Sequence, residues 1–428
     1  MYKKNSGWLM KFTLLNIFLT IILGNSSTFS IGSIFKGMPV KITEVVMIVN
    51  IFFLIIYFLN NKIYFKIRQQ KILIIWCLIG AISIIVNAVI YNYAMNEIAY
   101  GGLYCIRFLL YILYTIYVSE FMIINNFTIY KLFKFLINCY LIVAILGIIQ
   151  IIVWPIAVNF YSILSKMGVY LLNPDPHINR IISTYLDPNY LGAILIIPIT
   201  LNLILLIKEK KKIRNLITLA ILCSVLIGTV SRSALIGLVL SLIITFILIM
   251  IKLDSTKRIL INKKMLILMY VLSIIIPIIV IINLDSSRLL QRIVMFKDDP
   301  SALARFTNWR YSLSIVDNNQ LLGIGYNMLG FYTGNTESMT SFGVDASLLL
   351  VLITTGIIGL ITYVSYYINI IKKCIYFIKK ERYIFSALLG IIISSLVMSF
   401  FNNLLFYPLW MLPFFIVINF SINKEIKN

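Results

Sequence analysis

The chain has 428 residues, of which 61% are hydrophobic and only 12% are charged. Soluble domains carry about 25% charged residues and about 45–50% apolar ones, so this composition argues against a soluble fold. The formal net charge of +22 does not indicate a nucleic-acid-binding protein. Most basic residues fall in short turns between apolar runs, where membrane topology and anionic lipids account for them.

Twelve apolar runs follow one another along the chain, and a bilayer core about 30 Å thick takes about 20 apolar residues per helix. We therefore predict an all-α, polytopic transmembrane bundle of about 12 spans, forming a single integral membrane domain over residues 1–428. The first, seventh and twelfth runs are the weakest, because they are short or interrupted. The predicted spans are residues 8–24, 43–60, 72–91, 102–123, 135–155, 188–207, 215–230, 234–251, 265–284, 345–370, 383–402 and 406–422.

The loops between these spans differ sharply in charge. Cytoplasmic loops collect Lys and Arg. Of the 37 basic residues, 25 lie in the two terminal segments and in alternate loops, whereas ten lie in the opposite set of loops. We therefore predict that both termini and the KEKKKIR loop at 208–214 are cytoplasmic. The long segment 285–344 is then an external loop.

Three segments on the outward side carry most of the polar residues: 156–187, 228–234 and 285–344. Loops as long as the third are usually functional or disordered, and this one is too rich in aromatic residues to be disordered. Within it, SALARFTNWRYSLSIV is predicted to be helical, with Arg305 and Trp309 on one face. Arg310 is five positions from Arg305, about 140° around the helix, so the two arginines are expected to point to different places.

The outward segments are rich in arginine, whose planar guanidinium suits bidentate binding of phosphate. A surface arginine paired with Asp298, Asp299 or a lipid headgroup is the alternative for each. Arg107 differs, because it lies inside a predicted span, where charge is expensive and tends to mark function. Snorkelling to the interface is its alternative, and Glu44, near the start of a span, is expected at the interface. The outward arginines are Arg180, Arg232, Arg288, Arg292, Arg305 and Arg310.

Common cofactor and metal motifs are missing from the sequence. There is no P-loop, no GxGxxG and no HExxH, and the outward segments contain no DxD motif, so we expect neither a cofactor nor a metal ion. His177 is the only histidine, and a lone histidine in a loop is more often solvated than catalytic.

Four motifs occur in a fixed order on the outward side. Arg180 precedes STYLDPNYLGAIL, in which Pro188 and Asn189 open a span, and SRSALIGL opens another span after a short turn. The long loop then carries RFTNWRYSLSIVDNNQLLGIGYN, and Asp345 precedes a span that contains LLLVLITTGIIGL. In order, sidedness and spacing, residues 180–365 resemble the bacterial O-antigen polymerase and ligase family.

The resemblance implies a metal-independent, inverting glycosyltransferase with a lipid-linked donor. Such an enzyme moves a glycan from undecaprenyl pyrophosphate to an acceptor hydroxyl at the outer face of the bacterial plasma membrane. The polymerases use a second lipid-linked repeat unit as acceptor, whereas the ligases use lipid A–core and carry a His where this chain has Asp345. A polymerase of O-antigen, capsule or another surface polysaccharide is therefore favoured. Its expected partners are the lipid-linked oligosaccharide and membrane lipid, with a chain-length regulator and a flippase as further candidates.

The same resemblance assigns roles to residues. Negative charge grows on the leaving pyrophosphate, and fixed guanidiniums can stabilise it without a metal. A carboxylate near the acceptor hydroxyl can take its proton, and Asp345 is the candidate, with capping of its own helix as the alternative. The predicted catalytic residues are Asp345 and Arg305, and the predicted substrate-binding residues are Arg180, Asn189, Arg232, Trp309, Arg310 and Arg107.

Two other classes of function stay open. A lipid-linked oligosaccharide flippase or a twelve-span permease would place its binding groups near the midplane, on broken helices related by a repeat, whereas the polar groups here gather in outward loops. A ligase that attaches the glycan to a different acceptor shares the same chemistry. The sequence names neither the sugar, the linkage nor the acceptor.

Overall fold

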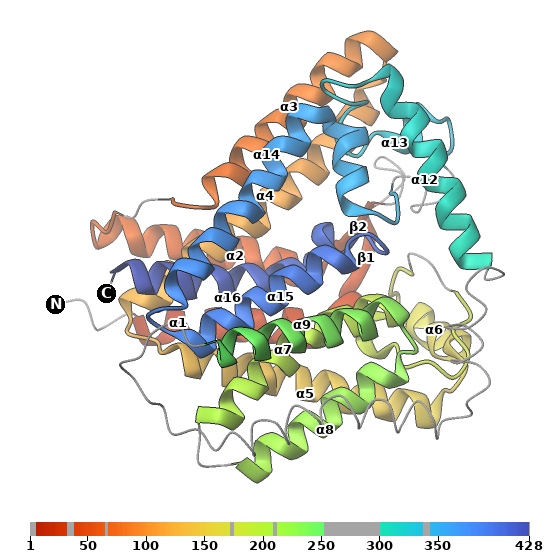
Figure 1. Ribbon diagram of the computed structural model, residues 1–428. Helices are drawn as coiled ribbons and strands as arrows, with labels where there is room; N and C mark the ends of the chain where they lie inside the picture. The colour runs from red at the N-terminus through yellow and green to blue at the C-terminus, as the bar shows by residue number, and fades with distance from the viewer. Residues whose placement is uncertain are drawn as a thin grey trace.

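The computed structural model describes residues 6–31, 38–64, 67–171, 175–208, 212–251, 300–336 and 343–427. The fold is an all-α helical bundle (Figure 1), and eleven of the twelve predicted spans coincide with helices. The remaining predicted span, 265–284, lies outside the described residues. These eleven helices are α1 (Ser6–Leu23), α2 (Ile42–Asn60), α3 (Lys71–Tyr91), α4 (Met95–Ile124), α5 (Ile129–Val153), α7 (Pro188–Lys208), α8 (Lys212–Gly228), α9 (Arg232–Met250), α14 (Ser347–Phe377), α15 (Arg382–Met398) and α16 (Pro408–Lys427).

Nine helices within the described residues are long and apolar enough to cross a membrane. The other two helices, α8 and α15, are shorter and have 17 residues each. Burial separates a centre from a periphery. In α7 and α16, 83% of the most apolar 18-residue stretch is buried inside the protein. The corresponding share is 39% in α3 and α9, which leave apolar side chains on the outside. An apolar exterior of this kind fits contact with lipid.

The short elements gather at one end of the bundle, opposite the end that holds the start of α1 and the end of α16 (Figure 1). They include a hairpin of β1 (Thr28–Ile31) and β2 (Met38–Lys41), which pair in antiparallel register and which the sequence did not predict. We call this the hairpin end and the other the terminal end. The 19-residue helix α12 (Pro300–Asn318) also lies at the hairpin end (Figure 1). The other short elements are α6 (Ala157–Lys166), α13 (Leu329–Tyr332), and the 3-10 turns η1 (Gly24–Ser27), η3 (Ser183–Tyr185) and η6 (Leu404–Phe406).

The distribution of loops over the two ends follows the predicted alternation. The terminal end holds the end of α2 and the start of α3, the end of α4 and the start of α5, the end of α7 and the start of α8, and the end of α14 and the start of α15 (Figure 1). The three segments predicted to face outward contribute their described residues to the hairpin end. The fold thus places the two sets of loops at opposite ends, while the compartment that each end faces stays a prediction.

Helix α14 is broken in its N-terminal half at Gly356, where φ is +65°. A Cβ atom added to Gly356 would lie 2.1 Å from the carbonyl oxygen of Leu321, so only glycine allows the loop 319–325 to approach this closely. The loop backbone replaces hydrogen bonds that the break removes, as a helix in an apolar setting requires. These bonds run from Ile324 N to Ile353 O (2.9 Å), from Gly325 N to Thr354 O (3.1 Å) and from Ile357 N to Gln320 O (2.8 Å).

At the terminal end, five polar side chains from four segments form a connected network that we call the terminal clasp. Glu120 is buried on α4, and its carboxylate accepts from Lys427 Nζ at 2.6 Å and from Asn423 Nδ2 at 3.0 Å, both on α16. The Asn423 side chain accepts in turn from Gln69 Nε2 at 3.2 Å. Lys373 of α14 then donates to Gln69 Oε1 at 3.0 Å. The clasp therefore joins α4, α14 and α16 to the segment before α3.

Candidate functional site

The two residues predicted to be catalytic lie next to each other at the hairpin end. Arg305 Nε is 3.4 Å from Asp345 Oδ2, and the side chains are 25% and 54% exposed. Helix α12 carries Arg305 and packs on α14, with Trp309 against a small apolar cluster that includes Val344 and Leu350. Trp309 follows Arg305 by one helical turn, so this packing directs the guanidinium of Arg305 toward the head of α14.

Asp345 does not cap its helix. Helix α14 begins at Ser347, its N-cap is Ala346, and no side chain makes the cap hydrogen bond. The capping interpretation is therefore wrong, because the helix begins two residues later than the predicted span. Partial burial raises the pKa of the Asp345 carboxyl above its usual range, and the nearby carboxylate of Asp187 acts in the same direction. Arg305 opposes the rise in pKa through its positive charge.

Arg180 joins two of the three predicted outward segments. Its Nε donates to the backbone oxygen of Thr229 at 2.8 Å, and its Nη2 donates to Asn189 Oδ1 at 3.0 Å. A backbone hydrogen bond from Ile181 N to Gly228 O at 2.9 Å holds the same two segments together. Arg180 and Asn189, predicted separately as substrate-binding residues, therefore form one hydrogen-bonded pair.

Asp187 belongs to this site, although sequence reasoning missed it. Its Oδ1 accepts from the backbone N–H groups of Asn189 at 2.7 Å and Tyr190 at 3.0 Å, so Asp187 caps α7. The signal was present, because an Asp directly before Pro188 and an apolar run is a strong helix start. Because Asp187 also acts on the pKa of Asp345, it links the Arg180–Asn189 pair to the Arg305–Asp345 pair.

Arg232 is the first residue of α9 and lies three positions after Thr229, which binds Arg180. The heads of α7 and α9 are close, since a Cβ atom added to Gly192 would lie 2.9 Å from Thr229 Oγ1 and 2.8 Å from the Cβ of Ala234. Arg180, Arg232 and Arg305 thus come from three distant segments to one end of the bundle. That they bind one pyrophosphate together stays a prediction.

Arg310 points away from Arg305. It is exposed, whereas Arg305 is partly buried against Asp345, so the predicted divergence of the two arginines on α12 is confirmed. A role for Arg310 in binding substrate stays a prediction. Arg288, Arg292, Asp298 and Asp299 lie outside the described residues.

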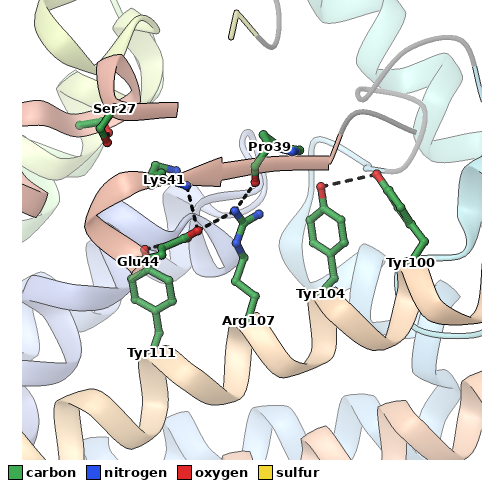
Figure 2. A network of polar contacts seen from close by, with 9 residues as sticks. Ser27, Pro39, Lys41, Glu44, Tyr100, Tyr104, Arg107 and Tyr111 are labelled. Carbon is green, nitrogen blue, oxygen red and sulfur yellow. Dashed lines mark hydrogen bonds and ion pairs between the residues drawn. The ribbon is translucent and has the colours of Figure 1, made fainter. Parts of the chain in front are cut away.

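Arg107 lies in a separate polar network (Figure 2). Its Nη2 is 2.8 Å from Glu44 Oε2 and also donates to the backbone oxygen of Pro39, and Tyr111 donates to Glu44 Oε1 at 3.1 Å. Glu44 also accepts from the backbone N–H of Lys41 at 3.1 Å. Glu44 lies in the first turn of α2 and its side chain is only 6% exposed, so it is buried within the protein. Its position at the membrane interface stays a prediction. The network fixes the hairpin to α2 and α4, and a substrate contact of Arg107 stays a prediction.

A cavity of about 140 Å³ lies beside Arg107, between α4, α14, η6 and the turn after Gly325. Most of its wall is apolar, but Arg107, Thr354 and two amide side chains, Asn327 and Asn403, also line it. The buried Asn327 Nδ2 and Asn403 Oδ1 atoms have no hydrogen-bond partner among the described residues. The cavity therefore offers one donor and one acceptor between aromatic walls.

His177 lies in an irregular segment of the hairpin end, where its backbone oxygen accepts from Ala157 N at 3.2 Å. Within the described ranges, no three His, Cys, Asp or Glu side chains gather in a way that could hold a metal ion.

Residues 217–364 match the family model described as O-antigen ligase. No curated protein matches the chain. The predicted resemblance to the O-antigen polymerase and ligase family is confirmed by this match. The matched range contains Arg232, Arg305, Trp309, Arg310 and Asp345, and it also includes the loop 319–325 with the glycine that receives it in α14.

Proposed function

We propose, on the premise of the O-antigen ligase domain at residues 217–364, that this multi-pass membrane protein is a polysaccharide polymerase. It transfers a glycan from undecaprenyl pyrophosphate to a sugar hydroxyl of a second lipid-linked repeat unit. The reaction takes place at the outer face of the bacterial plasma membrane. The observation that carries the proposal is the Arg305–Asp345 pair at the head of α14. The Arg180–Asn189 pair lies at the head of α7, whose cap Asp187 acts on the pKa of Asp345.

The chemistry of these groups suits a single displacement. The acceptor hydroxyl attacks the anomeric carbon of the donor glycan while Asp345 takes the hydroxyl proton. The bond from that carbon to the pyrophosphate oxygen breaks, and the pair of electrons leaves with the pyrophosphate. Attack from the opposite face inverts the anomeric centre. Arg305, with Arg180 and Arg232, stabilises the charge that grows on the leaving group, so the step requires no metal ion.

Two features favour Asp345 over Asp187 as the base. Asp187 already accepts two backbone hydrogen bonds as a helix cap, so its Oδ1 is occupied. Asp345 caps nothing, is half exposed, and has a raised pKa. A base that holds a proton more strongly than an ordinary carboxylate is better matched to neutral pH.

Polymerase activity is favoured over ligase activity because the family's ligases carry a His where this chain has Asp345. Transport is less well supported, although α14 is broken as transporter helices often are. Its break is closed by the backbone of residues 320–325, which leaves those groups no need of an ion or substrate.

Deletion of the gene in its host tests the function directly. We expect surface polysaccharide to collapse from a ladder to single repeat units, and wild-type protein but not the Asp345→Asn variant to restore the ladder. Loss of all external units, with lipid-linked units trapped inside, would instead indicate a flippase. A normal ladder in the deletion strain would refute the proposal.

Cysteine labelling tests the orientation. Thr307 is exposed on α12 at the hairpin end, and Lys379 is exposed after α14 at the terminal end. We expect Thr307→Cys to react with an impermeant maleimide on intact cells, and Lys379→Cys to react only after permeabilisation. The reverse pattern would place the arginines in the wrong compartment.

A further inference from the structure

The cavity beside Arg107 is distinct from the Arg305–Asp345 pair but shares α14 with it. Leu350 and Thr354 line the cavity and follow Asp345 by five and nine residues. Because α14 begins at Ser347, these residues lie roughly 5 Å and roughly 11 Å along the helix from its first residue, at about 1.5 Å per residue. The cavity is therefore within the reach of a glycan whose reacting end lies at Asp345.

The polar groups of the cavity are aimed by the backbone. Asn327 adopts a left-handed conformation with φ of +57°, directly after the Gly325 turn that inserts against α14. Asn403 lies next to Asn402, whose backbone oxygen accepts from Ser347 Oγ at 3.3 Å, and the Tyr190 hydroxyl bonds to the Asn403 backbone. Buried amide atoms usually form hydrogen bonds. Unpaired amide atoms on a cavity wall therefore indicate that a bound ligand supplies the missing donor or acceptor.

The walls of the cavity are mainly aromatic and apolar. Tyr104, Phe108, Tyr326 and Phe406 contribute rings, and Leu350 and Met411 contribute aliphatic atoms. An engineered apolar cavity of about 150 Å³ binds benzene, so 140 Å³ accommodates a six-membered ring. Ligand sites of this type combine apolar walls with a few placed polar groups.

Three occupants can be compared by what they satisfy. Water would pair with the Asn327 and Asn403 amides but would gain nothing from the rings. An isoprenoid segment would fill the apolar walls but would leave both amides unpaired. A pyranose ring satisfies both, because its hydroxyls donate and accept while its C–H face packs on an aromatic ring. We propose that this cavity binds one pyranose unit of the lipid-linked glycan, an assignment that rests on the proposed function for the identity of the glycan.

The test measures sugar binding rather than turnover, so that it stands apart from the test of polymerase activity. The full chain is placed in lipid nanodiscs without sugar-based detergent, and saturation-transfer NMR is recorded with a panel of neutral, N-acetylated and uronic methyl glycosides. Farnesyl phosphate serves as the isoprenoid probe. The variants are Asn327→Gly, which tolerates the positive φ, and Asn403→Ala. Asn215→Ala is the matched control, because Asn215 also holds a buried unpaired amide nitrogen but lies on α8, outside the cavity wall.

We expect at least one methyl glycoside to bind wild type and the Asn215→Ala control equally, and to bind each cavity variant at least tenfold more weakly. Farnesyl phosphate binding should not change in any variant. Absence of glycoside binding to wild type, or equal binding to all four proteins, would overturn the proposal. Farnesyl phosphate binding that is lost only in the cavity variants would assign the cavity to lipid instead. Glycoside binding that follows the expected order in a protein without polymerase activity would refute the proposed function alone.

Discussion

The terminal clasp and the Arg305–Asp345 pair, at opposite ends of the bundle, differ in how completely their polar atoms are paired. In the terminal clasp, both oxygens of Glu120 are occupied, and each further amide finds a partner along the chain of hydrogen bonds to Lys373. At the hairpin end, Arg305 Nε lies 3.4 Å from Asp345 Oδ2, and this buried nitrogen has no closer hydrogen-bond partner among the described residues. A satisfied network stabilises a fold, whereas an incompletely satisfied one leaves groups available for substrate.

The largest expected effect is on activity at the hairpin end. Asp345→Asn keeps the size of the side chain but removes the base, so turnover should fall by about 10²- to 10⁴-fold in a purified polymerisation assay. Thermal stability should stay within about 0.5 kcal/mol of wild type, because Asp345 neither caps α14 nor occupies the core. An Asn variant with near-normal turnover would reduce Asp345 to a structural residue.

Arg305→Lys is the second test, and it is paired with Arg310→Lys on the same helix. Lysine keeps the charge of Arg305 but not the planar fork, and a lost charge-assisted hydrogen bond of about 1.5–3 kcal/mol corresponds to a loss of roughly 10- to 100-fold in rate. The exposed Arg310 lacks the contact with Asp345, so its variant should lose less than threefold. Equal losses of rate in the two variants would show that the contact of Arg305 with Asp345 does not matter for activity.

The terminal clasp should respond in stability and not in catalysis. Lys427→Met leaves the Glu120 carboxylate, which is only 2% exposed, with one partner fewer. Breaking a buried pair costs about 3–5 kcal/mol, and we expect about 2–3 kcal/mol here because Lys427 is one-third exposed. Unfolding in mixed detergent measures the loss. Lys424→Met removes a hydrogen bond to the Phe127 backbone and a contact of the ammonium with the Phe420 ring, but no buried ion pair. It is the control and should cost less than half as much.

The smallest expected effect is a shift in pH dependence. If Asp345 must be ionised to act as a base, the rate rises with pH through its pKa, which burial has already raised. Arg305 lowers that pKa, so Arg305→Gln should move the acidic limb of the residual activity to higher pH. Arg310→Gln should leave the limb in place. A limb that moves to lower pH, or does not move, would mean that another group titrates.

Much of the fold could be predicted from the sequence, because each span is a local run of apolar residues. Eleven of the predicted spans coincide with helices of the structure. The alternation of charge correctly divided the described loops between the two ends of the bundle. The Arg305–Trp309 face and the divergence of Arg310 also follow from local helical spacing. These features depend on residues within one or two turns of each other.

The features that could not be predicted depend on distant residues. Glu44 and Arg107 are 63 positions apart, and nothing local indicates that they pair. The hairpin of β1 and β2 is short and contains Pro39, which weakens its signal as a strand. The sequence leaves capping by Asp345 open, because either of the two residues after it could begin the helix. The sequence signals Asp187 as a helix cap, but it does not show that this carboxylate acts on Asp345, which is 158 positions away.

The broken helix α14 has a consequence for which substitutions the chain can tolerate. The loop 320–325 is recognised through its main-chain atoms, while the side chain of Leu321 is 69% exposed. A mutational scan should therefore find residues 320 and 321 permissive. Gly323 and Gly356 should be intolerant, since an added Cβ atom would lie within 2.3 Å of a carbonyl oxygen at either position. The information that specifies this junction resides in glycines and backbone geometry, so the junction can persist while the side chains around it diverge.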